Sequence, residues 1–288
     1  MNGVINVIKP PGMSSSGVVV YLRRVLGEKK TGHAGTLDPG AAGVLPVLAG
    51  RSTRLSEIVM NHRKSYIAEV TFGTSTDTLD SYGAVTGRAD CDVSESQVKK
   101  LTGEFTGDMV QIPPHYSAVK VAGQKSYKLA RSGVATEKPP RNITIYSNEL
   151  VRQTGKNRFL IRVACSKGTY IRKLAEDMGA RLGLPAYLSF LLRDSSGGFS
   201  IEDGYTLDEI AAMASIGDTS FLKKPEEILG EMPRIDTKDK TAISNGGVIR
   251  EECPTDGYFR VYCENELYGL ALPCEGGYKL DILLRDQL

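Results

Sequence analysis

The chain has 288 residues, 41% of them hydrophobic and 24% charged, and a formal net charge of +2. These fractions are ordinary for a globular protein, and the length predicts one large domain with a smaller one beside it. No apolar run approaches the length of a membrane span, and the N-terminus lacks the shape of a signal peptide, so no membrane association is expected. Five cysteines without a C-x-x-C pair favour reduced thiols in a cytoplasm, and three histidines are too few for a histidine-rich zinc site.

The N-terminal segment predicts a strand, a turn and a helix. Residues 6–16, NVIKPPGMSSS, run from a short strand through a Pro-Pro-Gly turn to serines that can cap a helix. Apolar residues recur at helical spacing from Val18 to Leu26, and Gly27 ends the pattern. On its own, Lys9 could be an ordinary surface lysine.

Residues 32–50, GHAGTLDPGAAGVLPVLAG, form a glycine-rich loop that presents one carboxylate, Asp38, ahead of an apolar run that predicts a buried strand. A purely structural turn is the plain interpretation. However, metal sites and paired-carboxylate hydrolases require clustered ligands or two acids, and this loop has one. A solitary and rigidly held aspartate instead suits a nucleophile or a general base.

A strand is predicted at residues 66–72, where polar and apolar side chains alternate. Tyr66, which opens this strand, could serve core packing alone. In the following polar segment, Asp77 and Asp80 are typical turn formers. A capping box at Ser94 and Gln97 then predicts a helix that reaches about residue 101.

Residues 115–146 are rich in cations and tyrosines, and Glu137 is their only acid. Cations suit phosphates, and aromatic rings between them suit the splayed bases of single-stranded or looped RNA. A solvated hairpin and helix is the alternative interpretation. The candidate RNA-contacting side chains are Lys120, Lys125, Lys128, Arg131 and Arg141.

The segment after residue 158 predicts a strand to Cys165, a turn at Gly168, and a helix that Thr169 can cap. Arg172 stands near the N-terminus of this helix, where a cation gains nothing from the helix dipole. An acidic partner is therefore expected for Arg172, although a surface arginine is the alternative. Another strand is predicted at residues 187–193, followed by a helix with a capping box at Thr206 and Glu209.

The chain changes character after residue 232. Short strands at 258–263, 266–272 and 278–284 are separated by turn residues and predict a small β-rich module. Residues 1–232 hold 29 basic and 24 acidic side chains, a net charge of +5, whereas residues 233–288 hold 7 and 10, a net charge of −3. The larger part is therefore the better candidate for contacting phosphates.

Three motifs resemble those of the TruB family of tRNA pseudouridine synthases. They are N-V-I-K-P-x-G-M-S-S from Asn6, G-H-x-G-T-L-D-P-x-A-x-G-V-L-P from Gly32, and K-G-T-Y-I-R from Lys167, in family order over roughly residues 4–230. The resemblance implies an α+β pseudouridine synthase fold with a mixed, largely antiparallel central sheet flanked by helices and loops. It also implies a catalytic domain at 1–232, an RNA-clasping insertion near 115–146, and a PUA-like domain at 233–288.

The resemblance also assigns roles to individual residues. Asp38 would be catalytic and Arg172 would pair with it, while Lys9 and Pro10 would support the active-site loop. Four side chains would bind the substrate: His33 filling the gap or stacking in the RNA, Tyr66 against the target base, Leu191 under the base, and Arg172. For His33, a hydrogen bond that stabilises the loop is the alternative.

The implied reaction converts a uridine in the T-loop of tRNA (family position 55) to pseudouridine. The bond from ribose to base nitrogen breaks, the base rotates, and a bond to carbon forms, after the base has been flipped out. Asp38 could attack the base, attack the sugar or remove a sugar proton, and the sequence does not choose among these steps. No cofactor, metal or obligate protein partner is expected. The protein is expected to be a monomer in the cytoplasm. The alternatives are a guide-RNA-dependent synthase subunit and a non-catalytic RNA-binding or RNA-folding protein.

Overall fold

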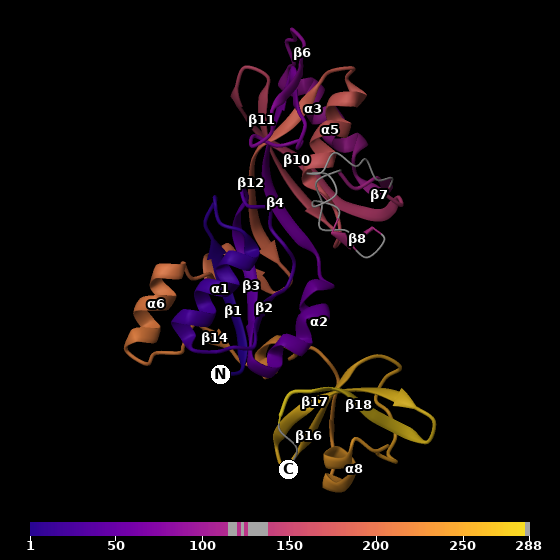
Figure 1. Ribbon diagram of the computed structural model, residues 1–288. Helices are drawn as coiled ribbons and strands as arrows, with labels where there is room; N and C mark the ends of the chain where they lie inside the picture. The colour runs from indigo at the N-terminus through magenta and orange to yellow at the C-terminus, as the bar shows by residue number, and fades with distance from the viewer. Residues whose placement is uncertain (115–119, 122–123, 126–137, 286–288) are drawn as a thin grey trace.

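The computed structural model describes residues 1–114, 120–121, 124–125 and 138–285. Within these residues, ten strands form one sheet that runs the length of an elongated body, and a separate four-stranded sheet lies at one end, near the N-terminus (Figure 1). The large sheet contains β1 (Gly3–Lys9), β2 (Thr31–His33), β3 (Ala42–Ala49), β4 (Lys64–Phe72), β7 (Gly107–Gln111), β10 (Arg141–Gly155), β11 (Arg158–Cys165), β12 (Ala186–Ser196), β13 (Phe199–Ser200) and β14 (Leu222–Lys223).

The main path of the large sheet has the order β14-β1-β3-β12-β4-β11-β10-β7. Among its described pairs, β12 and β3 are parallel and the remainder are antiparallel. The expected mixed, largely antiparallel sheet is therefore confirmed. Two short ribbons lie outside it, β5 (Thr74–Thr76) with β6 (Val85–Arg88), and β8 (Lys120–Val121) with β9 (Gln124–Lys125).

Helices pack on this sheet and bury one extended apolar core. The side chain of Ser14 caps α1 (Ser15–Leu26) by accepting from the Gly17 amide, and Gly27 ends the helix in a left-handed conformation. Both predicted capping boxes, at Ser94 and at Thr206, are present. The helices and 3-10 turns are α1 (Ser15–Leu26), η1 (Gly50–Leu55), α2 (Ser56–Met60), α3 (Glu95–Glu104), α5 (Ile171–Arg181), η2 (Ile201–Asp203), α6 (Leu207–Ser215), α7 (Pro225–Ile228) and α8 (Lys240–Asn245). Within the described residues, no helix combines the length and the apolar character needed to cross a lipid bilayer.

The prediction that Thr169 caps α5 was wrong. The helix begins at Ile171 with Tyr170 as its N-cap residue, and the Thr169 hydroxyl instead donates to the carbonyl of Ser166 at 3.0 Å. The side chain of Gln111 contacts the helix entry in its place, accepting from the Tyr170 amide at 2.8 Å and donating to the Tyr170 carbonyl at 3.1 Å. A long-range contact from β7 thus holds the N-cap residue in place, and among the described residues no side chain caps the first turn of α5.

The four-stranded sheet at the C-terminal end contains β15 (Arg234–Asp236), β16 (Phe259–Cys263), β17 (Glu266–Cys274) and β18 (Gly277–Leu283). One apolar cluster joins it to the N-terminal part, because Leu267 and Leu270 of β17 are buried with Leu48 and Leu55. Arg54 also donates to the carbonyl of Leu283 at 2.8 Å. The division of the chain at residue 232 stays a prediction, and the small sheet is packed against the rest of the protein.

Gly43 lies where β3 runs beside β12, and neither its backbone conformation nor the space around it suits a larger residue. Its φ is +104°, and a Cβ atom there would lie 2.2 Å from the carbonyl oxygen of Arg193. We expect Gly43→Ala to lower the free energy of unfolding by about 3 kcal/mol or more, measured by urea denaturation. As a matched control, Gly103→Ala changes a glycine of α3 with nothing within 4 Å, and it should raise stability by about 0.5–1 kcal/mol. Equal effects would contradict the steric argument.

Candidate active site

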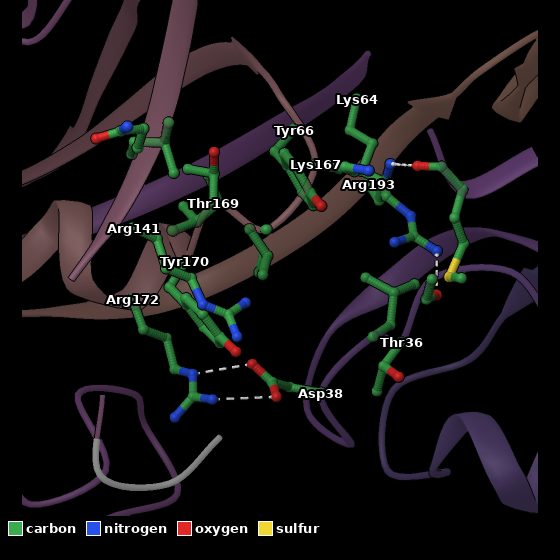
Figure 2. Close-up of a pocket in the computed structure, with 18 of the residues that line it drawn as sticks. Thr36, Asp38, Lys64, Tyr66, Arg141, Lys167, Thr169, Tyr170, Arg172 and Arg193 are labelled. Atoms are coloured by element: carbon green, nitrogen blue, oxygen red, sulfur yellow. Dashed lines mark hydrogen bonds and ion pairs between the residues drawn. The ribbon is translucent and has the colours of Figure 1, made fainter. Parts of the chain in front are cut away.

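A cavity of about 730 Å³ opens between the loop that carries Asp38 and the start of α5. Residues from five separate parts of the chain line it (Figure 2). The described lining residues are Gly35, Thr36, Leu37, Asp38, Glu57, Met60, Lys64, Tyr66, Arg141, Asn142, Ile143, Lys167, Gly168, Thr169, Tyr170, Ile171, Arg172, Leu191 and Arg193.

Asp38 and Arg172 form a two-point ion pair at this cavity. The guanidinium Nε donates to Oδ2 of Asp38 at 2.8 Å and Nη2 donates to Oδ1 at 3.1 Å, as the dashed lines in Figure 2 show. The arginine is buried, whereas the aspartate side chain is 40% exposed. The expectation of an acidic partner for Arg172 is confirmed, and the carboxylate is held in a fixed direction while a substrate can still reach it.

Arg172 also ties the site to the turn that follows β5. Its Nη1 donates to the Thr78 carbonyl at 2.9 Å, and its Nε lies 3.8 Å from Oδ2 of Asp80. The other carboxylate oxygen of Asp80 accepts from the Thr78 hydroxyl and the Tyr82 amide, so the prediction of a turn former is confirmed. The contact between Asp80 and Arg172 was not predicted, because the two residues are far apart in sequence.

Lys9 and Ser15 hold the Asp38 loop through hydrogen bonds to its backbone. The buried Lys9 ammonium donates to the carbonyls of Pro10, Met13 and Pro39, at 2.8, 2.6 and 3.1 Å. The Ser15 hydroxyl both donates to and accepts from the backbone of Leu37, at 2.9 Å each. The residues on both sides of Asp38 are therefore tied to the first turn of the chain, which supports the expected supporting role of Lys9 and Pro10.

Burial and the nearby Arg193 guanidinium lower the pKa of Lys9 from 10.5 to about 8, although Asp38 opposes this shift. The folded protein then releases this proton near pH 8, while the unfolded chain keeps it to about pH 10.4. Between these values the unfolded state binds more protons, so the free energy of unfolding rises with pH. We expect wild type to gain stability relative to Lys9→Met from pH 7 to pH 10, measured by urea denaturation at each pH. A constant difference would contradict the lowered pKa.

Tyr66 and Arg193 face each other as register partners on β4 and β12. Tyr66 is 7% exposed and lines the cavity, and burial raises the pKa of its hydroxyl, which therefore stays protonated. Arg193 is 1% exposed and donates to the carbonyls of Val44 at 2.7 Å and Gly35 at 3.0 Å. Sequence reasoning missed Arg193 as a site residue, although an arginine within an apolar predicted strand was a usable signal.

Lys64 is a second cation that sequence reasoning left unassigned. It is buried, lines the cavity, and donates to the carbonyls of Met60 at 2.8 Å and His62 at 2.9 Å. Burial, reinforced by Arg193 and Lys167, lowers its pKa to about 8. Figure 2 shows these cations grouped with Tyr66, away from the Asp38–Arg172 pair.

The remaining predicted residues divide into three groups. Leu191 and Arg141 line the cavity. His33 lies in β2 opposite Val47 and is not among the described lining residues. In the basic segment, the backbones of Lys120 and Lys125 pair across β8 and β9, and the predictions for Lys128 and Arg131 lie outside the described residues.

The charged side chains of the cavity are mainly cationic. Among the described lining residues, the two acids Asp38 and Glu57 face five cations, namely Lys64, Arg141, Lys167, Arg172 and Arg193. Such an excess attracts a polyanionic substrate to the cavity. A single oriented and reachable carboxylate in this setting defines a site for nucleophilic or general-base chemistry on a substrate that carries phosphates.

Comparisons with known proteins agree with this class of site. The family model described as "TruB family pseudouridylate synthase (N terminal domain)" matches residues 23–171. The chain is 49% identical over 222 residues to the tRNA pseudouridine synthase B of Pelotomaculum thermopropionicum, covering 75% of this chain and 70% of the relative. It is 41% identical over 271 residues to that of Streptococcus sanguinis, covering 90% and 93%. The chain belongs to the TruB family of pseudouridine synthases.

Two solved structures share the fold. A chain of an H/ACA RNP bound to a substrate RNA containing 2′-deoxyuridine superposes with a TM-score of 0.74 at 22% identity, covering 99% of this chain and 86% of that one. A chain of a Cbf5-Nop10-Gar1 complex gives 0.71 at 25% identity, covering 99% and 85%. These likenesses extend the comparison to the small C-terminal sheet, which the family model does not reach.

Proposed function

We propose that this protein is a tRNA pseudouridine synthase, an isomerase that converts the uridine at position 55 in the T-loop of tRNA to pseudouridine. Its close similarity to tRNA pseudouridine synthase B of several bacteria supports this activity and substrate. The observation that carries the proposal within the structure is the reachable Asp38 carboxylate, held by Arg172 at the edge of a cationic cavity.

The proposed chemistry rests on Asp38. With the uridine flipped into the cavity, the carboxylate attacks the base or the sugar, or removes a sugar proton, and the bond from ribose to base nitrogen breaks. The base then rotates and its C5 atom bonds to C1′ of the ribose. C5 gives up its proton and the freed N1 gains one, so no atom is gained and no redox change occurs. Arg172 holds the carboxylate in a fixed direction through two charge-assisted hydrogen bonds.

Tyr66 and Leu191 are the proposed contacts to the base. Both side chains line the cavity from neighbouring strands of the central sheet, and the protonated Tyr66 hydroxyl can donate to a polar atom of the base. The cavity volume of about 730 Å³ is ample for one nucleoside. His33 lies outside the described lining, which suits the proposed role of filling the gap or stacking in the RNA rather than contacting the reacting base.

The proposed domain arrangement places catalysis in residues 1–232 and assigns the small sheet of residues 233–288 to a PUA-like domain. The insertion near residues 115–146 is the proposed clasp for the T stem-loop, and Arg141 connects it to the cavity. The proposed partner is tRNA alone, bound by a cytoplasmic monomer. The guide-RNA alternative is retained because a chain of an H/ACA RNP shares the fold. Relatives at 41–49% identity favour the tRNA enzyme.

A direct test incubates the purified protein with an unmodified tRNA transcript, without other proteins or guide RNA, and maps pseudouridine by chemical labelling and primer extension. Conversion of position 55 supports the proposal. A transcript with cytidine at that position is the matched substrate control. Conversion only after a guide RNA is added would favour the guide-dependent alternative, and tight tRNA binding without conversion would favour the non-catalytic one.

A further inference from the structure

Two aromatic side chains with no assigned role stand beside the Asp38–Arg172 pair. Tyr82 is 67% exposed and Phe190 is 46% exposed, and both line a shallow recess of about 30 Å³. Asp38, Arg172 and Leu191 line this recess as well as the large cavity. These three residues therefore form a wall with the proposed uridine site on one side and the exposed aromatic pair on the other.

The backbone holds Tyr82 in place. Its amide donates to Asp80 at 3.1 Å, in the turn whose Thr78 carbonyl receives Arg172. Its ring packs on Gly40, where a Cβ atom would lie only 2.1 Å from Cε2 of Tyr82. The ring is therefore seated against the Asp38 loop, yet most of its surface remains open to solvent.

The position of Phe190 follows from an irregularity in β12. Leu188 pairs with Val70 and Phe190 with Glu69, so Ser189 is the additional residue of a bulge. Such bulges redirect side chains at a sheet edge or beside an active site. The Leu188 amide also donates to the Leu79 carbonyl at 3.0 Å, which fixes this part of β12 to the turn that carries Tyr82.

Single exposed apolar residues are normal on protein surfaces and need no explanation. Here two aromatic rings are exposed together, on a rigid frame, next to a carboxylate that must meet an RNA loop. Flat rings beside a cationic groove are the usual means by which proteins bind unpaired bases. The recess is too small to enclose a base, so it suits a base lying on the surface.

We infer that Tyr82 and Phe190 form a stacking platform for an unpaired base next to the target uridine in the RNA loop. This inference rests on the proposed function and adds a second nucleotide contact to the same site. The target uridine enters the large cavity on one side of Asp38 and Arg172, while the backbone carries a neighbouring nucleotide over the recess on the other side. The platform thereby positions the substrate without touching the reacting atoms.

The test measures RNA affinity and turnover for Tyr82→Ala and Phe190→Ala on a T stem-loop RNA. We expect Kd and KM to rise about tenfold for Tyr82→Ala and at least about threefold for Phe190→Ala, with kcat within about twofold of wild type. Tyr82→Phe keeps the aromatic ring, so the Kd of this variant should equal that of wild type. Ile216→Ala and Val151→Ala remove exposed side chains away from the site and are the matched controls.

An abasic substitution identifies the base. Two RNAs are compared, one without the base before the target uridine and one without the base after it. If Tyr82 stacks on one of these bases, Tyr82→Ala should no longer raise Kd for the RNA that lacks that base, since ring and base act as a pair. The inference would be overturned if both alanine variants had the wild-type Kd, or if the effect of Tyr82→Ala on Kd simply added to that of each abasic substitution. The two aromatic rings would then be a contact surface for a protein partner. Because Kd is measured independently of turnover, an inactive wild type would reject the proposed function without deciding the stacking.

Discussion

Replacing Asp38 by asparagine should abolish pseudouridine formation while RNA binding survives. The side chain keeps its shape, and its remaining oxygen can still accept from Arg172, but the negative charge that performs the proposed chemistry is lost. We expect turnover to fall by at least about 10⁴-fold, which is the scale of losses for a residue that carries the reaction. The measurement is single-turnover conversion of a tRNA transcript, with Kd determined in parallel.

RNA affinity should stay within several-fold of wild type in this variant. Binding depends on phosphates and unpaired bases, and the five cations that line the cavity remain in place. Glu57→Gln is the matched control because Glu57 is the other described acid of the cavity and has no role in the proposed reaction. Its turnover should remain within about tenfold of wild type. Measurable turnover by Asp38→Asn, or an equal loss in Glu57→Gln, would contradict the assignment of the reaction to Asp38.

Sequence patterns within a few residues predicted several helix ends correctly. Short-range rules were sufficient for the capping boxes at Ser94 and Thr206 and for the left-handed Gly27, because the interacting atoms lie within one turn of each other. Electrostatic reasoning about Arg172 predicted an acidic partner, and the motifs identified Asp38 as that partner across 134 residues. Element types were therefore accessible from the sequence, and so was the central ion pair.

Long-range packing accounts for what was missed. Whether an arginine or lysine in a strand is buried depends on which strands lie beside it, and the pairing of β12 with both β3 and β4 encloses Arg193. The entry of α5 depends on Gln111, 59 residues earlier, rather than on the local Thr169. The exposed platform of Tyr82 and Phe190 likewise depends on a bulge and a turn that meet only in the folded chain.

Arg172→Lys should be nearly as damaging as a change to Asp38, although it preserves the charge. The guanidinium makes two hydrogen bonds to Asp38 and a third to the Thr78 carbonyl, in a planar arrangement that a lysine ammonium cannot reproduce. Released from this fork, the carboxylate and the Thr78 turn are each free to shift, and displacements of about 1 Å can cost a hundredfold in rate. We expect turnover to fall at least about 100-fold.

Arg181→Lys provides the comparison on the same helix. Arg181 is exposed and pairs with Glu104 on the surface, a type of interaction worth about 0–1 kcal/mol. The turnover and stability of the Arg181→Lys variant should therefore match those of wild type. Single-turnover rates and urea denaturation of the two variants separate a catalytic loss from a folding loss. If Arg172→Lys turns over near the wild-type rate, then the fork does not orient Asp38. If its rate falls only in proportion to the unfolded fraction, Arg172 is a structural residue and the aim of the carboxylate must come from the Lys9 and Ser15 contacts beneath the loop.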